Sequence, residues 1–332
     1  MILGIYIGAA LISWTLCSPV LGWLKKKNAW DRPNDRSSHE EPTLRGGGIA
    51  SLIVIVFVIG LWVCPEAPKL GYTWIGGLII LSSVSLRDDL GDVSIAQRLI
   101  AQTVAVGMVI WALLANDQSL GVMLITCFAM VSYINFVNFM DGINGLVAGM
   151  IMLVTLGVVW VFPDMNWLCQ VVALTLAGTV AGFLPFNFPK AKMFLGDVGS
   201  ITLGFSSSVL ILWIWTDNPT GPNRLLLPVF VLYFFLEGMI VLLRRMLAGK
   251  KWWEPHKEHF YQRMVSCGYS HARTTSLIIC IQCFVTVLVW SASLSVWSPE
   301  LSWVLSILLW AGFFVYVDIK FRNMKKNQSI EL

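Results

Sequence analysis

The stretch "LGVMLITCFAMVSYINFVNFMDGINGLVAGMIMLVTLGVVWVF", residues 120–162, decides the fold, because it joins two long apolar runs through a short polar segment. An α-helix needs about 20 mostly apolar residues to cross the hydrocarbon core of a bilayer. Within the polar segment, Asn135, Asn138 and Asp141 are spaced by three, which predicts that they share a helix face. Polar groups are costly at a membrane boundary, so the segment is either a capped helix connection or a functional site.

The composition of the whole chain is that of a polytopic membrane protein. Of its 332 residues, 57% are hydrophobic and 13% are charged, whereas a soluble domain averages about 25% charged residues. The mean hydropathy is +0.73. Only helices and closed barrels span lipid, and the sequence lacks the period-2 alternation of a barrel. We therefore predict an all-α helical bundle that forms a single transmembrane domain over residues 1–332.

About eleven apolar stretches are expected to cross the membrane. They cover roughly residues 1–24, 46–64, 71–86, 95–115, 120–138, 142–162, 167–185, 198–216, 223–243, 274–295 and 301–319. When the loops are assigned alternately to the two sides, one side holds every Lys and Arg except Lys69 and Arg224. Positive charge is retained on the cytoplasmic side, so the N-terminus is expected outside and the C-terminus inside.

The polar residues with chemical potential lie on the same face as the positive charge. Cytoplasmic loops near 25–45, 87–95, 138–142, 186–197 and 244–273 are expected to form an active site, whereas the outer loops are short. A transporter would keep polar groups near the membrane midplane. The pattern favours chemistry at the inner leaflet. The alternative is a membrane transporter or lipid-binding protein without chemistry, and the feature that fits it is Glu237, an acidic residue well inside an apolar run.

Three aspartates in this face are candidate catalytic and metal-binding residues. Asp88 and Asp89 are adjacent at the end of the third apolar run, and Asp197 stands between glycines at the start of the eighth. Neighbouring carboxylates repel each other unless a cation is near, and Mg²⁺ is typically held by one or two carboxylates together with substrate phosphates. A helix N-terminus after Asp197 would favour an anion. The alternatives are a solvated helix end for the pair and a helix cap for Asp197.

The longest inner loop contains "KKWWEPHKEHFYQRM", which is rich in histidine and positive charge. His256 and His259 are three residues apart, but no third soft ligand is spaced to complete a zinc site. Binding of an anionic substrate is more natural, and contact with anionic lipid headgroups is the alternative. Arg45, which precedes three glycines, is a candidate phosphate clamp. The predicted substrate-binding residues are Arg45, Asn135, Asn138, Asp141, Asn144, His256, His259 and Arg263.

Five motifs taken together resemble a known family. They are "RSSHEEPTLRGGGI", "DDLGD", "NFMDGINGL", "FLGDVGS" and "PHKEHFYQRM", in this order, between about residues 31 and 271. The chain resembles the polyprenyl-phosphate N-acetylhexosamine-1-phosphate transferases, and within them the WbpL-like branch that initiates O-antigen synthesis. The resemblance implies that a polyprenyl phosphate attacks the β-phosphorus of a UDP-activated amino sugar and that UMP leaves. The sequence leaves direct attack and a covalent aspartyl-phosphate intermediate both open. Direct attack requires less of the protein, because a deprotonated phosphate is already a nucleophile.

The resemblance also implies roles for single residues. Asp88 and Asp89 match paired aspartates near the metal and the lipid phosphate, and Asp197 matches a metal-binding aspartate. Asn138 and Asp141 match the nucleotide-binding segment, and the histidines match a motif that meets substrate phosphate. Two departures are notable: Asn144 stands where relatives often carry an acidic residue, and the basic residue that often follows the paired aspartates is missing, with Arg98 as its replacement.

The implied cofactor and partners follow from this resemblance. The cofactor is Mg²⁺, with Mn²⁺ as the alternative. The expected partners are undecaprenyl phosphate, a UDP-N-acetyl amino sugar and the lipid bilayer; a homodimer is allowed for, and no nucleic acid is expected. The expected location is the bacterial inner membrane, with a cytoplasmic active site.

Overall fold

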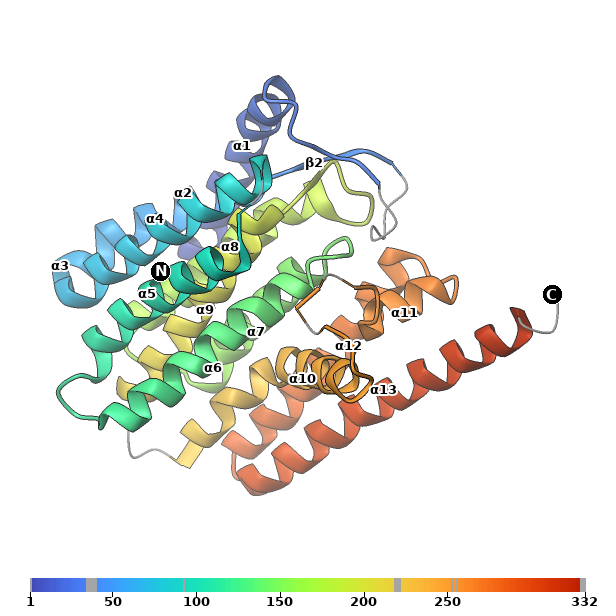
Figure 1. Ribbon diagram of the computed structural model, residues 1–332. Coiled ribbons are helices and arrows are strands. Elements are labelled where there is room, and N and C mark those ends of the chain that lie inside the picture. The colour runs from blue at the N-terminus through green and yellow to red at the C-terminus, as the bar shows by residue number, and fades with distance from the viewer. Residues whose placement is uncertain are drawn as a thin grey trace.

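The computed structural model describes residues 2–33, 41–91, 93–217, 222–251, 253–254 and 256–328. It is a bundle of long helices, with the two ends of the chain toward opposite ends of the bundle (Figure 1). Within the described residues, ten helical segments are long and apolar enough to cross a membrane, and a shorter apolar helix spans Leu146–Val161. The prediction of an all-α, polytopic membrane bundle is confirmed.

The helices follow the apolar runs of the sequence closely. They are α1 (Ile2–Lys26), α2 (Gly48–Val58), a π-helical segment (Ile59–Val63), α3 (Cys64–Glu66), α4 (Pro68–Leu90), α5 (Ile95–Leu114), α6 (Leu120–Phe139), α7 (Leu146–Val161), α8 (Trp167–Asn187), α9 (Gly196–Asp217), a 3₁₀ helix (Pro222–Val231), α10 (Leu232–Leu247), α11 (Phe260–Ser266), α12 (His271–Ser293) and α13 (Pro299–Gln328). Polar caps begin several of them: Ser94 and Gln97 form a capping box at α5, and Asn166 caps α8.

Two predicted spans begin differently from the sequence expectation, for local reasons. The run expected from 142 becomes helical only at Leu146, because Gly145 adopts φ +76°, which excludes it from a right-handed helix. The run expected from 223 starts as the 3₁₀ helix, which contains Pro228. A proline lacks the backbone N–H needed for an α-helical hydrogen bond. The pattern of apolar residues alone does not predict the left-handed Gly145 or the 3₁₀ helix.

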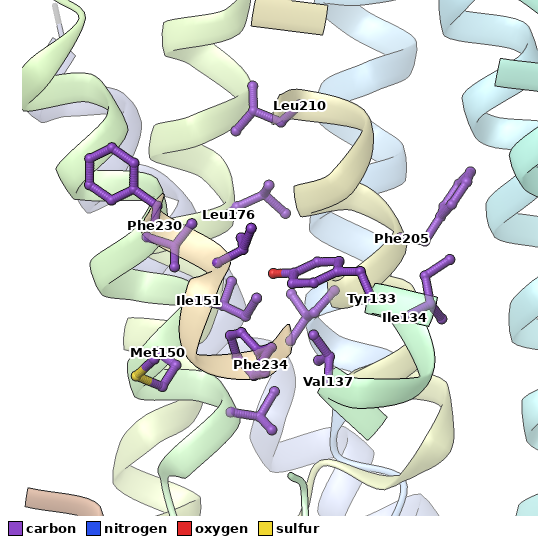
Figure 2. Close-up of a cluster of buried hydrophobic side chains, with 14 of the residues drawn as sticks. Tyr133, Ile134, Val137, Met150, Ile151, Leu176, Phe205, Leu210, Phe230 and Phe234 are labelled. Atoms are coloured by element: carbon purple, nitrogen blue, oxygen red, sulfur yellow. The ribbon is translucent and has the colours of Figure 1, made fainter. Parts of the chain in front are cut away.

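The core surrounds α9, which is the most buried long helix. In an apolar 18-residue segment of α9, 83% of the residues are buried. The corresponding share is 28% for α6 and 22% for α1. Figure 2 shows side chains from α6, α7, α8 and α9 converging with Phe230 and Phe234, and the hydroxyl of Tyr133 points into this cluster. That hydroxyl pairs with Ser207 Oγ of α9 at 3.3 Å. Since α9 is central, its N-terminal residues lie near the middle of one end of the bundle.

Close helix packing in this bundle depends on small residues, as is usual where lipid removes most of the hydrophobic driving force. Gly178 and Gly182 of α8 face the backbone of α1. A Cβ atom at Gly182 would lie 2.2 Å from the carbonyl oxygen of Ala10. The two helices therefore approach backbone to backbone.

A three-stranded sheet, which the sequence analysis did not predict, lies at one end of the bundle. It consists of β1 (Trp30–Asp31), β2 (Thr43–Arg45) and β3 (Met193–Phe194) in the order β1-β2-β3. β1 and β2 are antiparallel, and β2 and β3 are parallel, with Arg45 opposite Phe194. Figure 1 places β2 and α11 toward the end of the bundle away from α3. The predicted inner loops meet at this end.

Candidate active site

The small sheet brings residues that are 152 positions apart in sequence into contact. Strand β2 ends at Arg45, β3 ends at Phe194, and the N–H groups of Gly47 and Gly48 donate to the carbonyl oxygens of Phe194 and Leu195 at 2.8 and 2.9 Å. The starts of α2 and α9 are thereby joined. Gly48 and Gly199 touch through their backbones, since a Cβ at Gly48 would lie 2.1 Å from the Cα of Gly199. Arg45 consequently reaches the first turn of α9.

Arg45 lies between two carboxylates. Its Nε is 2.8 Å from Oδ1 of Asp89, at the end of α4, and its guanidinium also binds Asp197, in the first turn of α9. The backbone N–H of Asp197 donates to Oδ1 of Asp89 at 3.4 Å. The Asp89 and Asp197 side chains are only 6% and 9% exposed. Two of the three predicted metal-binding aspartates thus lie side by side, nearly buried.

The third aspartate, Asp88, is held next to this pair by α5 and the residues that precede it. Arg98 Nη1 of α5 lies 2.9 Å from its Oδ2, and the N–H of Val93 donates to its Oδ1 at 3.2 Å. Asp88 also faces the carboxyl group of Asp197. Arg98 therefore takes the position of a basic partner to the paired aspartates. Asp92, in the same loop, lies outside the described residues.

These carboxylates fit a hard divalent cation that is bound together with a phosphate substrate. Oδ2 of Asp89 is buried and has no hydrogen-bond partner in the part of the chain that the structure describes. A buried carboxylate oxygen without a partner is costly, and a metal ion would satisfy it. Among the described residues, no group of three or more His, Cys, Asp and Glu is arranged as a complete metal site. Mg²⁺, which typically keeps water and substrate phosphate as ligands, suits such a partial carboxylate set, whereas a structural zinc does not.

Asn138 and Asp141 lie at the same end, where α6 passes into α7. Ser200 Oγ of α9 donates to Asn138 Oδ1 at 2.6 Å, which fastens the end of α6 to α9. The pKa of Asp141 is raised well above its ordinary value, mainly by burial; Arg45 opposes the shift, and repulsion from Asp197 and Asp89 adds to it. Asp141 therefore lies within the field of the aspartate cluster.

Asn135 and Asn144 use their side chains within the protein. Asn135 Nδ2 donates to Oε1 of Gln102 at 2.7 Å, and Gln102 Nε2 donates back at 3.4 Å, so the amide pair joins α5 to α6. Asn144 Nδ2 donates to the carbonyl oxygen of Pro189 at 3.0 Å. Both contacts stabilise the scaffold beside the site, and a substrate contact for either residue stays a prediction.

The loop between α10 and α11 carries His256 and His259 and is called the histidine loop. It contacts the α6–α7 connection through aromatic rings. The rings of His256 and His259 stack with centroids 4.8 Å apart, and the ring of His259 lies 6.0 Å from that of Phe139. The hydroxyl of Tyr261 donates to the carbonyl oxygen of Phe139 at 2.8 Å. Burial, helped by the nearby His259 and Arg245, lowers the pKa of His256 to about 4, so this ring is neutral at pH 7.

Arg263 binds groups outside the cluster of Asp88, Asp89 and Asp197. Its Nη1 lies 2.6 Å from Oδ1 of Asp318 in α13, and its Nε donates to the carbonyl oxygen of Glu258 at 2.9 Å. Arg244 binds the same Asp318. This arrangement attaches the histidine loop to the last helix. The predicted substrate role of Arg263 stays a prediction, and residues 34–40, Trp252 and Pro255 of the quoted motifs lie outside the described residues.

Asn187 is a supporting residue that the sequence analysis missed. Its Oδ1 accepts the N–H of Gly145 at 2.6 Å, and its Nδ2 donates to the carbonyl oxygen of Met193 at 3.1 Å. It therefore links the α6–α7 turn to β3, and so to the segment that carries Asp197. The sequence feature that could have identified Asn187 is its place at the end of an apolar run, directly before Phe-Pro.

Comparisons with known proteins show what the chain is similar to. Residues 72–214 match the family model described as Glycosyl transferase family 4. This range includes Asp88, Asp89, Asp141 and Asp197. Over these residues, which make up less than half of the chain, the protein is similar to this family.

Two relatives are similar over most of the chain. A decaprenyl-phosphate N-acetylglucosaminephosphotransferase of Mycobacterium tuberculosis is 27% identical over 81% of this chain and 77% of its own length. An undecaprenyl-phosphate alpha-N-acetylglucosaminyl 1-phosphate transferase of Escherichia coli K12 is 25% identical over 88% of this chain and 83% of its own length. The similarity therefore extends beyond the family model and includes most of the membrane bundle.

Proposed function

We propose that the protein transfers an N-acetylated amino-sugar 1-phosphate from a UDP-sugar to undecaprenyl phosphate or another polyprenyl phosphate. The products are a polyprenyl-diphosphate sugar and UMP, and the reaction initiates an O-antigen or related cell-envelope polysaccharide. The observation that supports this most strongly is the group of Asp88, Asp89 and Asp197 beside Arg45, at one end of a membrane bundle. The names of the relatives point to the same class of reaction.

The proposed reaction exchanges one phosphorus–oxygen bond for another. An oxygen of the lipid phosphate attacks the β-phosphorus of the UDP-sugar, and the bond from this phosphorus to the bridging oxygen breaks. UMP leaves with that oxygen, while the bond between the sugar and its phosphate stays intact. No proton has to move, so positioning and charge neutralisation provide the catalysis.

The residues of this chain have complementary tasks in that scheme. Asp88, Asp89 and Asp197 would hold Mg²⁺, which neutralises charge between two anionic reactants. Arg45 brings a fixed positive charge to the same point, and its bidentate geometry suits phosphate oxygens. Asn138 and Asp141 would line the side of the site that faces the nucleotide. His256 and His259 would cover that side from the histidine loop.

A donor panel tests the proposal. Purified protein is incubated with undecaprenyl phosphate, Mg²⁺ and one of several UDP-N-acetylhexosamines, and UMP is measured. We expect UMP release that requires the lipid phosphate, stops with EDTA and returns when Mg²⁺ is added. If no donor in the panel yields lipid-dependent UMP, the proposed activity is wrong.

The proposed cytoplasmic position of the site makes a separate prediction. A cysteine introduced at Lys251, in the histidine loop, should react with an impermeant thiol reagent only after the inner face is opened. Gln118→Cys is the matched control, because residue 118 is exposed in the loop between α5 and α6, on the other side of the proposed topology. It should be labelled in intact spheroplasts. Labelling of Lys251→Cys in intact spheroplasts would show that the histidine loop faces outward and would contradict the proposed orientation.

A further inference from the structure

We propose that Glu237 is a positioning residue that holds the ring of His259 by its Nδ1 atom and directs Nε2 toward the substrate phosphates. This inference rests on the proposed function for the identity of the ligand. Glu237 lies in α10, and its one notable feature in the sequence is a negative charge in an apolar run. The structure gives that charge a defined partner.

Both oxygens of the Glu237 carboxylate are occupied by the histidine loop. Oε2 lies 2.7 Å from Nδ1 of His259, and Oε1 accepts the backbone N–H of Phe260 at 2.7 Å. The Glu237 side chain is fully buried, and that of His259 is 6% exposed. Two short hydrogen bonds from adjacent residues define the position and the angle of the loop at this point.

The hydrogen bonds also select one state of the ring. In the proposed arrangement the carboxylate of Glu237 only accepts hydrogen bonds, so Nδ1 of His259 carries the proton in their contact. Nε2 is then the ring atom that remains for a ligand. The backbone of His259 is held separately, since its N–H donates to Oε1 of Gln262 at 3.1 Å and its carbonyl oxygen accepts the N–H of Arg263 at 2.9 Å. Partners that fix a histidine through its second nitrogen act in this way in many sites.

The contacts of His259 place it beside the α6–α7 turn of the candidate site. Its ring lies against Phe139, the last residue of α6, and stacks on His256. Tyr261, two residues on, packs over Gly142, where a Cβ would lie 2.2 Å from its hydroxyl oxygen. His259 therefore lies next to the turn that holds Asp141. A buried acidic side chain within a membrane bundle is costly, and a role in the site explains why it is placed there.

Solid-state NMR of protein labelled with ¹⁵N-histidine tests the inference without any need for activity. The His259 signal is identified by its loss in His259→Gln. In the wild type, we expect Nδ1 to show the shift of a protonated ring nitrogen. In Glu237→Gln, the amide oxygen still accepts from Phe260 and the amide NH₂ faces Nδ1, so Nδ1 should change to the shift of an unprotonated nitrogen. An unprotonated Nδ1 in the wild type would overturn the inference even if Glu237→Gln did not fold.

Glu254→Gln is the matched control. Glu254 is in the same loop, is 53% exposed and pairs with Lys251, so the same substitution there should leave the His259 signal unchanged. A folded Glu237→Gln protein with an unchanged Nδ1 signal would also refute the inference.

Activity provides the second measurement. Glu237→Gln should lower kcat/KM by about 10- to 100-fold, as is typical when a partner that orients a functional histidine is removed. The same change in a His259→Gln background should cause no further loss, since Glu237 acts through His259. Equal losses in both backgrounds would contradict the inference. If the wild type showed no transfer at all, the proposed function would fail, while the NMR result would still decide the role of Glu237.

Discussion

Asp197→Asn is expected to reduce transfer by about 100-fold or more while the protein stays folded. The substitution keeps the shape of the side chain but removes the charge that would hold the divalent cation and that binds Arg45. Losing one preorganised electrostatic contact of this kind typically costs about 2.7–4 kcal/mol of transition-state stabilisation, which is about 10²–10³-fold in rate. Release of UMP measures the loss, and thermal unfolding in detergent measures the fold.

Asp164→Asn is the control for this experiment. Asp164 is exposed in the connection between α7 and α8, away from the site, so the same change there should leave the rate unaltered. Full activity of Asp197→Asn at ordinary Mg²⁺ concentrations would remove Asp197 from the metal site. A parallel loss of folded protein and of activity would instead make Asp197 a structural residue.

Gly48→Ala is expected to lower both stability and activity. A Cβ at this position would lie 2.1 Å from Cα and 2.5 Å from N of Gly199, and these are backbone atoms that cannot rotate away. Overpacking typically costs about 1–3 kcal/mol, and here the strain falls on the junction of α2 and α9. Any separation of these helices displaces Arg45 from Asp197, so the transfer rate should fall together with the unfolding temperature.

The control is Gly107→Ala, in the middle of α5, where nothing lies within 4 Å of a new Cβ. Alanine is the better helix former by about 1 kcal/mol, so this variant should be as stable as the wild type or more so. A Gly48→Ala protein with unchanged unfolding temperature and activity would show that the α2–α9 contact does not position the site.

Sequence reasoning found the fold and the aspartates for the same physical reason. In a chain this apolar, charged and polar residues stand out, and the distribution of basic residues predicts their side of the membrane. Asp88, Asp89 and Asp197 were therefore selected without knowledge of the fold. The structure places them together, because α4 and α9 end and begin at the same side of the bundle.

The contacts of Arg45 were harder to predict. Its position depends on strands of two and three residues, which are too short to show an alternating pattern. Only the three glycines that follow Arg45 hinted at a close backbone approach, and the partner helix was not identifiable from them.

For Asn135, Asn144 and Arg263, the sequence predicts substrate contacts, whereas the structure shows contacts with other protein groups. They have the residue types of a binding site, but tertiary packing gives their side chains protein partners: Gln102, the Pro189 carbonyl group and Asp318. Glu237 had an ambiguous signal, since a lone acid in an apolar run fits a transport path as well as a site. Its contact with His259 is defined only once α10 and the loop are placed side by side.

Transfer of the sugar together with its phosphate is tested by following that phosphate. The purified protein is given Mg²⁺, undecaprenyl phosphate and UDP-N-acetylglucosamine labelled with ³²P at the β-phosphorus, or the donor that the panel selects. We expect the label to move into the lipid product in a one-to-one ratio with UMP. Label that stays in water-soluble UDP, with only the sugar on the lipid, would contradict it.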